Sequence, residues 1–392
     1  MCIRDRPKGV LVSHANLAHY AAAVSQRLQA SAGSRWATLA TVAADLGLTC
    51  VFAALHSGDP LILPDAALAF DPPGWADFLA QHPVDCLKIA PSHLRGLLAL
   101  DDARRVLPRR LLVLGGEGFD AALFARIREL APELRVFNHY GPSETTVGVV
   151  CGEVTEAGQG VYLPLGQPLA GAELRIVDTA GQPVPHGVAG ELLIGGPQVA
   201  LGYLGQPEAT ATAFIEDAGQ RFYRSGDRVR LDHHGRLLFL GRQDDQVKIR
   251  GFRVEPGEVS AWLGRQSLVR EAAVLAREIQ GRLQLVAYVA PRLNPDELSA
   301  LQAQARAQLP EALQPAYWSS LDALPLTANG KLDRRALPEP ETNLAVDAGG
   351  QAPQSASEVL LARLWCQVLG CASVCRQDDF FALGGDSILS LQ

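Results

Sequence analysis

The sequence predicts an α/β fold with a large layered domain, a small β subdomain, an α+β unit and the first part of a helical domain. From residue 7 to about residue 240, strand-like runs alternate with helical patterns, which is typical of a layered α/β domain. Between residues 160 and 240, short strands joined by Gly/Pro turns predict the β subdomain. Beyond a stretch rich in Pro, Gly, Ser and Ala at 338–357, an apolar stripe predicts a further helix.

The elements of the large domain follow from local patterns. The segment "ALFARIREL" (122–130) predicts a helix, and "RRLLVLGGEG" (109–118) predicts a strand that runs into a glycine turn. The segment "LRVFNHYGPSETT" (134–146) predicts a strand followed by a polar loop, and "GRLLFLGRQDDQVKIRG" (235–251) predicts a hairpin. The later expected elements are helices at 258–266, 296–309 and 357–370 and strands at 272–278 and 283–291.

Composition excludes several classes of function. The 392 residues are 48% hydrophobic and 20% charged, with a formal net charge of -7 and no basic block, so we expect neither nucleic acid nor an anionic membrane surface as a partner. The sequence contains no run of eighteen apolar residues and no signal peptide. The seven scattered cysteines form no CxxC pair, which predicts free thiols in a reducing cytoplasm.

Lys88 is unusual because it lies in a short apolar run that reads as a buried strand, "VDCLKIAPSH". A buried ammonium group without a partner costs several kcal/mol and tends to lose its proton. Two interpretations remain open from the residues alone: Lys88 reaches the surface from the end of a strand, or it is paired inside a site.

Four polar segments are candidates for a functional site. The loop "NHYGPSETT" (138–146) follows a predicted strand and offers an aromatic ring, hydroxyls and a carboxylate, which suit a base, a phosphate and Mg²⁺. Asp227 follows a tight turn, Lys331 lies in an Asn-Gly turn, and Ser387 follows Gly-Gly-Asp at the start of a predicted helix. Taken singly, these residues are better explained as turns, a solvated lysine and a helix N-cap.

In this order, the segments resemble the adenylation domain of nonribosomal peptide synthetases followed by a peptidyl carrier domain. The matching motifs are "PKG" (7–9), "NHYGPSETT" (138–146), "GELLIGGPQVALGYL" (190–204), "YRSGD" (223–227), "GRQDDQVKIRGFRVEPGEV" (241–259), "NGKLD" (329–333) and "LGGDSI" (383–388). The resemblance implies an adenylate-forming large subdomain at 7–240, truncated at its start, and a mobile C-terminal subdomain at 241–337. A linker at 338–357 and a carrier domain at 358–392, truncated at its end, would follow.

The resemblance also implies roles for individual residues. Tyr140 would stack on the adenine of ATP, Asp227 would hold the ribose and Glu144 would bind Mg²⁺. Lys331 would bridge the substrate carboxylate and the α-phosphate by electrostatic stabilisation, and Ser387 would carry 4'-phosphopantetheine. The other residues implied at the nucleotide, the hinge and the thiol entry are Gly116, Glu117, Gly141, Ser143, Arg242, Asp244 (the hinge) and Gly251.

The same resemblance implies a pocket that selects L-aspartate. Asp45 would bind the α-ammonium group and Lys331 the α-carboxylate, while Lys88 pairs with the β-carboxylate and His139 donates a second hydrogen bond. The residues implied around the side chain are Leu46, Thr49, Lys88, Val113, Gly115, His139, Val147 and Gly148. Asparagine is the alternative substrate, because its amide oxygen could accept from Lys88 but would leave the charge uncompensated.

Two other functions remain open: an acyl- or aryl-CoA ligase of the same superfamily, and a non-catalytic fragment of a synthetase. Asp45 and the fused carrier segment favour the synthetase over the ligase, although Asp45 on its own would fit a helix N-cap equally well. The expected partners are an amino-acid substrate, a phosphopantetheinyl transferase and neighbouring modules such as condensation domains.

Overall fold

The computed structural model describes residues 8–383, except 41–44, 157–161, 218, 244–245, 250–251, 280–281, 326–331, 341–350, 370, 372, 379 and 381–382. Three of the predicted functional residues, Asp244, Lys331 and Ser387, lie outside the described residues, as does Gly251. The six cysteines within them are free thiols, as predicted. No helix in the described part of the chain is long and apolar enough to cross a membrane.

A seven-stranded sheet forms the centre of the large domain, with strand order β3-β2-β4-β5-β6-β7-β8. The strands β2 to β6 run parallel, whereas β7 and β8 are antiparallel to their neighbours. The strands are β2 (Trp36–Thr38), β3 (Leu61–Ile62), β4 (Cys86–Ile89), β5 (Leu111–Gly115), β6 (Arg135–Tyr140), β7 (Val150–Glu153) and β8 (Gln167–Pro168). The predicted α/β class is therefore confirmed.

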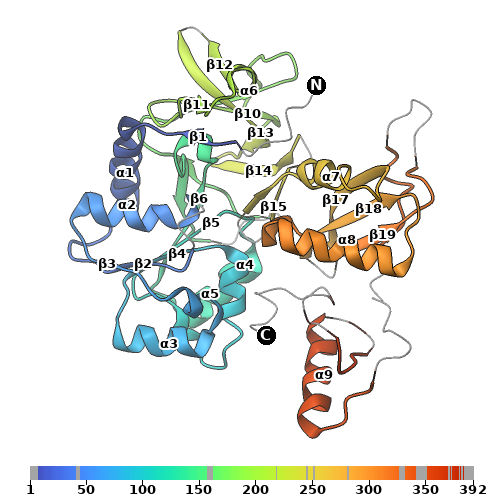
Figure 1. Cartoon of the computed structure of the whole chain (residues 1–392). Coiled ribbons are helices and arrows are strands. Elements are labelled where there is room, and N and C mark those ends of the chain that lie inside the picture. The colour runs from blue at the N-terminus through green and yellow to red at the C-terminus, as the bar shows by residue number, and fades with distance from the viewer. Residues whose placement is uncertain are drawn as a thin grey trace.

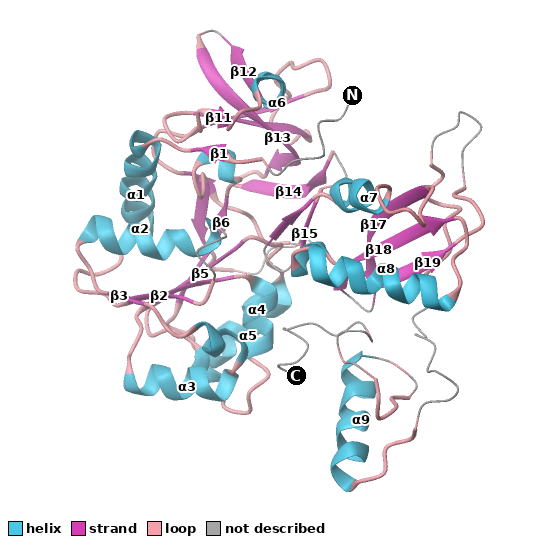
Figure 2. Cartoon of the chain, viewed as in Figure 1, coloured by secondary structure: helices cyan, strands magenta, loops and turns pink. Residues whose placement is uncertain are grey.

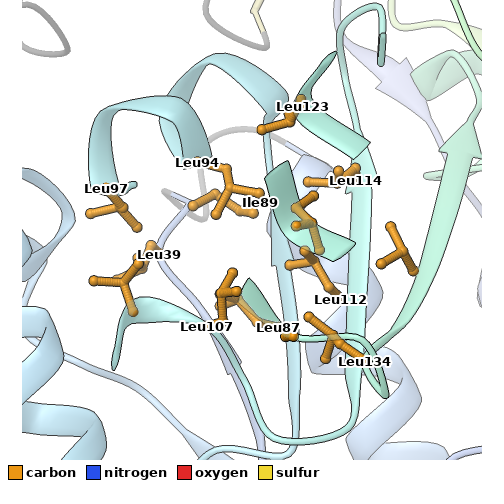
Figure 3. Close-up of a cluster of buried hydrophobic side chains, with 14 of the residues drawn as sticks. Leu39, Leu87, Ile89, Leu94, Leu97, Leu107, Leu112, Leu114, Leu123 and Leu134 are labelled. Atoms are coloured by element: carbon orange, nitrogen blue, oxygen red, sulfur yellow. The ribbon is translucent and has the colours of Figure 1, made fainter. Parts of the chain in front are cut away.

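Helices cover both faces of this sheet (Figure 1). On one face lie α1 (His14–Leu28) and α2 (Leu48–Ser57), and on the other lie α3 (Pro72–Gln81), α4 (Pro91–Leu97) and α5 (Ala121–Leu130). Successive strand residues point to opposite faces, so Leu87 and Ile89 pack with the α3–α5 side (Figure 3), whereas Cys86 packs with α1 and α2. Burial on both sides explains why these strands read as almost continuous apolar runs.

The start of α1 is held firmly in two ways. Ser13 and Asn16 form a capping box, in which the Asn16 amide donates to the Ser13 hydroxyl oxygen at 3.1 Å and the Ser13 amide donates to Asn16 Oδ1 at 2.9 Å. The Asn16 side-chain amide also donates to the carbonyl oxygens of Pro197 (2.6 Å) and Val199 (3.1 Å). The helix is thereby tied to the β subdomain, which orients the inward-facing Tyr20.

The predicted β subdomain is a five-stranded sheet, β12-β13-β10-β9, with β14 paired to β13. Figure 2 labels its strands β12, β13 and β14. Its strands are β9 (Glu173–Val177), β10 (Gly190–Gly195), β12 (Phe214–Asp217), β13 (Gln220–Leu231) and β14 (Leu237–Arg242), with α6 (Pro207–Ala213) beside them. A separate two-stranded ribbon pairs β1 (Val10–Leu11) with β11 (Gly202–Tyr203).

The prediction that residues 235–251 form one hairpin is wrong. Its first half, β14, pairs with β13 so that Asp227 lies opposite Arg242, whereas its second half, β15 (Val247–Ile249), pairs with β16 (Phe252–Val254). The two halves belong to different sheets because the long strand β13 offers β14 an antiparallel edge and an ion pair between Asp227 and Arg242. Local alternation cannot show which partner a strand takes.

The C-terminal α+β unit has its own sheet and core. The strands β17 (Glu271–Ile279), β18 (Arg282–Ala290) and β19 (Tyr317–Ser320) are covered by α7 (Pro256–Leu263) and α8 (Pro295–Gln308). The final helix, α9 (Ala356–Leu369), confirms the helix predicted there, and its Leu360 (57% exposed), Leu361 and Leu364 face solvent. Short 3₁₀ turns complete the described elements at Asp45–Gly47 (η1), Ala66–Phe70 (η2), Ala103–Val106 (η3), Ser143–Thr145 (η4) and Glu311–Leu313 (η5).

Candidate active site

A pocket of about 230 Å³ lies at the carboxyl ends of β4, β5 and β6. The C-terminal unit contributes Lys248 from β15 and Phe252 from β16 to its wall. The lining residues are Asp45, Leu46, Lys88, Gly116, His139, Gly141, Pro142, Ser143, Val147, Asp227, Arg242, Lys248 and Phe252. Ten of these thirteen were predicted as site residues from the sequence, so part of the predicted set lines one cavity, whereas Gly115, Glu117, Tyr140 and Gly148 are not in its lining.

The parallel register brings the substrate side of the pocket together. In the ladder, Lys88 of β4 lies opposite Val113 of β5, and Gly115 of β5 lies opposite His139 of β6. These residues share the face of the sheet that packs against α1 and α2, because side chains alternate along a strand. Lys88 and His139 therefore point at the same space although they are far apart in the sequence.

Lys88 is 1% exposed, so the interpretation that it reaches solvent from a strand end is wrong. Its Nζ lies 2.7 Å from His139 Nδ1 and 3.2 Å from Thr49 Oγ1. Both partners are uncharged at neutral pH, because burial and the nearby charges of Lys88 and Lys248 hold the His139 pKa well below its usual range. Lys88 makes no ion pair with a carboxylate of the described chain.

The electrostatics of the pocket floor follow from this burial. Desolvation lowers the pKa of the Lys88 ammonium group to about 8. Burial also raises the pKa of the Cys50 and Cys151 thiols to about 12, so neither supplies a negative charge to offset Lys88. The pocket floor thus holds a cation whose hydrogen-bond partners are neutral.

Asp45 opens the 3₁₀ turn η1 and accepts a hydrogen bond from the Ser143 hydroxyl. The alternative interpretation of Asp45 as the N-cap of the following helix is wrong, because the N-cap of α2 is Gly47, which makes no side-chain capping bond. The carboxylate instead lines the pocket, together with Leu46.

Three glycines allow close packing of the chain around Lys88 and His139. A Cβ atom at Gly115 would collide with the His139 carbonyl oxygen and lie 3.3 Å from Lys88 Nζ. A Cβ atom at Gly148 would overlap the His139 ring, and one at Gly141 would overlap the backbone of Gly148. The small residues at these positions are therefore a steric requirement.

On the nucleotide side, Asp227 is the centre of a polar cluster. Its carboxylate accepts from the Tyr140 hydroxyl through one oxygen and pairs with the Arg242 guanidinium group through the other. Burial and the Asp227 carboxylate raise the Tyr140 pKa well above its usual range, so the hydroxyl stays protonated. The Lys248 ammonium group lies 5.2 Å from the centre of the Tyr140 ring.

Several other predicted residues have structural partners. The Glu117 carboxylate accepts from the amide (3.0 Å) and the hydroxyl (2.9 Å) of Ser92 in the first turn of α4. Glu144 is buried and accepts from the Tyr203 hydroxyl at 2.6 Å, outside the pocket lining. Thr49 and Val113 are fully buried behind the lining rather than in it.

Sequence reasoning missed Tyr20, Lys248 and Phe252. The Tyr20 hydroxyl lies 2.9 Å from Thr49 Oγ1 and 3.2 Å from His139 Nε2, and it is buried beneath the pocket. Lys248 and Phe252 belong to the motif at 241–259, but alternation along two short strands does not reveal which face meets the pocket. A lone tyrosine on an alanine-rich helix face carries no signal of its own.

A second, more open hollow of about 490 Å³ lies between α1 and the β6–β8 edge of the sheet. Two of its arginines are used to hold the structure: Arg27 donates to the carbonyl oxygens of Cys151 and Pro168, and Arg135 pairs with Glu153. None of the predicted functional residues lines it.

Comparison with known proteins gives a consistent result. The family model described as AMP-binding enzyme matches residues 6–204, and the model of the AMP-binding enzyme C-terminal domain matches residues 258–331. The chain is 37% identical to malpibaldin synthetase of Mortierella alpina over 395 residues and 35% identical to tyrocidine synthase 3 of Brevibacillus parabrevis over 390 residues. These matches cover 98% of this chain but only 7% and 6% of the two relatives.

Among solved structures, holo-PA1221, a nonribosomal peptide synthetase protein containing adenylation and PCP domains, superposes with a TM-score of 0.79 at 30% identity. That match covers 98% of this chain and 64% of the other. The two family models and this structure match the parts of the chain that build the α/β layers. The pocket at the carboxyl ends of β4, β5 and β6 lies mostly within the segment matched by the first model. The chain therefore belongs to the AMP-binding enzyme family, among the adenylation domains of nonribosomal peptide synthetases.

Proposed function

We propose that this chain activates L-aspartate with ATP as the aminoacyl adenylate and transfers it to the phosphopantetheine thiol of a fused carrier domain. Attack of a carboxylate on the α-phosphate of ATP brings two anions together, so catalysis needs fixed positive charge near the reacting atoms. Arg242 and Lys248 line the pocket and supply such charge, and we propose Lys331 as the catalytic lysine. The membership of the chain in the adenylation family supports this reaction.

The nucleotide side has a suitable donor set for ATP. A carboxylate can accept two hydrogen bonds from a ribose diol, and Asp227 already accepts from two donors, Tyr140 and Arg242, that a bound nucleotide could replace or join. We propose that Tyr140 faces the adenine, and that Gly116, Glu117, Gly141 and Ser143 surround the nucleotide.

Mg²⁺ usually takes one or two protein carboxylates together with substrate phosphates and water. No cluster of three or more His, Cys, Asp or Glu residues suited to a metal occurs in the described part of the chain. We propose Glu144 as the protein ligand; when bound, the ion would neutralise charge on the phosphates.

One observation carries the choice of substrate: Lys88 is a buried ammonium group at the pocket whose two hydrogen-bond partners, Thr49 and His139, are neutral. A side-chain carboxylate would supply the missing charge, and the pocket of about 230 Å³ must also hold the nucleotide side, which favours a short side chain. Asp45 at the same pocket would take the α-ammonium group. Asparagine would leave the Lys88 charge uncompensated, and a larger apolar residue would offer Lys88 neither a charge nor a hydrogen-bond acceptor.

The test is amino-acid-dependent pyrophosphate exchange with the intact protein that carries this sequence. Removing one partner of a buried charged pair costs about 2–5 kcal/mol, so Lys88→Met should lower kcat/KM for aspartate by about 30- to several-thousand-fold. The matched control is Leu87→Met, on the same strand but pointing into the opposite core. Best activation of an apolar amino acid, or aspartate turnover by Lys88→Met within a few-fold of wild type, would refute the substrate assignment.

Pyrophosphate exchange together with a thioester assay separates the alternatives. Thioester formation from free CoA and a simple acid, without exchange for any amino acid, would indicate an acyl-CoA ligase. We propose Ser387 as the phosphopantetheine attachment residue, Asp244 as the hinge of the C-terminal unit, and a phosphopantetheinyl transferase and neighbouring condensation domains as partners.

A further inference from the structure

A closed ring of hydrogen bonds lies under the pocket, and Tyr20 is the member that comes from outside the predicted site. Its hydroxyl is 3.2 Å from His139 Nε2 and 2.9 Å from Thr49 Oγ1, and Lys88 Nζ is 2.7 Å from His139 Nδ1 and 3.2 Å from Thr49 Oγ1. The rings of Tyr20 and His139 also meet edge to face, with centroids 6.1 Å apart and planes at 72°. Tyr20 is 1% exposed and does not line the pocket, so any effect on substrate must pass through these contacts.

The proton positions in this ring follow from the chemistry of its members. A lysine ammonium group has three N–H donors and no acceptor, so His139 Nδ1, which faces it, must accept. The neutral imidazole then carries its proton on Nε2 and donates to the Tyr20 oxygen. The Tyr20 hydroxyl is left to donate to Thr49 Oγ1, the second acceptor of Lys88.

This arrangement uses two of the three N–H groups of Lys88, on His139 and Thr49, and Lys88 itself lines the pocket. No third acceptor for Lys88 Nζ occurs among the described residues, so the third N–H is available to a ligand there. It also changes the part expected of His139: both of its ring nitrogens contact protein groups, Lys88 and Tyr20, so it has no N–H to donate to the substrate. His139 acts on the substrate through Lys88.

We propose that Tyr20 is a positioning residue for substrate selection, which holds His139 in the Nε2–H tautomer so that Lys88 stays protonated and directs its third N–H at a side-chain carboxylate. This inference rests on the proposed specificity for aspartate and extends it to a residue of α1. In the opposite tautomer, His139 Nδ1–H would face the Lys88 ammonium group, donor against donor, which favours loss of the Lys88 proton.

The first experiment reads the tautomer directly and needs neither substrate nor a variant. Selective ¹⁵N-histidine labelling of the intact protein, with His139→Gln to assign the signal, should show a neutral His139 ring that is protonated at Nε2 and unprotonated at Nδ1. A ring protonated at Nδ1 in the wild-type protein would overturn the inference even if aspartate proves to be the substrate. If a Tyr20 variant does not fold, this measurement still tests the tautomer on which the inference depends.

The second experiment removes the acceptor while keeping the aromatic ring. Tyr20→Phe should lower the ratio of kcat/KM for aspartate to that for asparagine by about tenfold, the scale of one hydrogen bond within a charged network. The loss should appear mainly in KM for aspartate, with KM for ATP unchanged, and the His139 signal should lose its single Nε2–H form. The matched control is Tyr288→Phe, whose buried hydroxyl donates to the Pro338 carbonyl oxygen in the C-terminal unit.

The outcomes separate the two proposals. An unchanged aspartate preference in a folded Tyr20→Phe protein would overturn the role of Tyr20 while leaving the aspartate proposal intact. A wild-type protein that does not activate aspartate would refute the substrate assignment, and the role of Tyr20 in selection would fall with it even if the Nε2–H tautomer is found.

Discussion

Raising the pH from 7 to 9 should remove most of the preference for aspartate, because the ammonium group proposed to recognise its side chain titrates in this range. Desolvation lowers the Lys88 pKa from its ordinary 10.5 to about 8. With that pKa, about nine tenths of the free protein carries the ammonium at pH 7 and about one tenth at pH 9. Because kcat/KM reports the titrating groups of the free enzyme, the value for aspartate should fall about tenfold over this interval.

The titratable side chains around Lys88 do not change their charge between pH 7 and 9, so they would not cause this fall in kcat/KM. Burial raises the pKa values of Tyr20, Cys50 and Cys151 and lowers that of His139, so all four stay neutral between pH 7 and 9. The charged groups that also act on Lys88 are Asp45 of η1, which stabilises the ammonium form, and Lys248 of β15, which opposes it.

The assay is pyrophosphate exchange with aspartate and asparagine at pH 7, 8 and 9. The aspartate-to-asparagine ratio of kcat/KM should fall, because a neutral Lys88 amine still donates to an amide oxygen but no longer pairs with a carboxylate. Lys88→Met controls for titration of the substrates themselves and should show a low ratio at every pH. A wild-type ratio that stays constant from pH 7 to 9 would refute the reasoning.

The same shift has a consequence for stability. A lysine whose folded pKa is depressed binds fewer protons in the folded state than in the unfolded state between pH 8 and 10.5, so the free energy of unfolding should rise with pH in that window. The full shift corresponds to about 3 kcal/mol. Below pH 8 both states are protonated and the cost of burying the charge is present in full. Denaturant titrations of wild type and Lys88→Met across this window measure the difference.

Two further predictions concern other parts of the site. Gly148→Ala should lower kcat/KM for aspartate by at least about tenfold, because the new methyl group would overlap the His139 ring. The control is Gly264→Ala, where the nearest atom to a Cβ is 3.5 Å away. Equal small effects of both variants in exchange assays would contradict the steric argument. Lys331→Ala should abolish adenylate formation but still transfer a supplied aspartyl adenylate to the carrier thiol, as measured by mass spectrometry of the loaded carrier. Equal loss of both steps would argue that Lys331 is needed in each.

Much of the site was predictable because its residues sit in continuous motifs. Tyr140, Gly141 and Ser143 lie in one short segment at the end of a strand, and Asp227 follows a tight turn, so the order of the motifs and their resemblance to a known family predicted them as site residues. The structure brings Lys88, Gly116, Gly141 and Ser143 to one pocket because parallel strands present their carboxyl ends at the same edge of the sheet, and Tyr140 bonds Asp227, which also lines it. Elements with strong local periodicity, such as α5 and α8, were likewise predictable.

The wrong prediction of a hairpin at 235–251 shows that local patterns do not predict strand pairing. Alternation and turn residues identify β14 and β15 as strands, but the partner of each strand is chosen by distant segments, β13 and β16. The same limit applies to Lys248 and Phe252, whose approach to the pocket depends on how the C-terminal unit meets the large domain.

Lys88 shows what the sequence determines and what only the tertiary structure decides. The sequence by itself determined that a lysine interrupts an apolar strand, and the period of two along a strand means that it shares a face with Cys86. Only the tertiary structure decided that α1 and α2 cover that face and bring Thr49 and Tyr20 to the ammonium group and to His139. The physical reason is that a buried charge is tolerated through contacts at a few ångströms, and such contacts join residues whose separation along the chain carries no information about their distance in space.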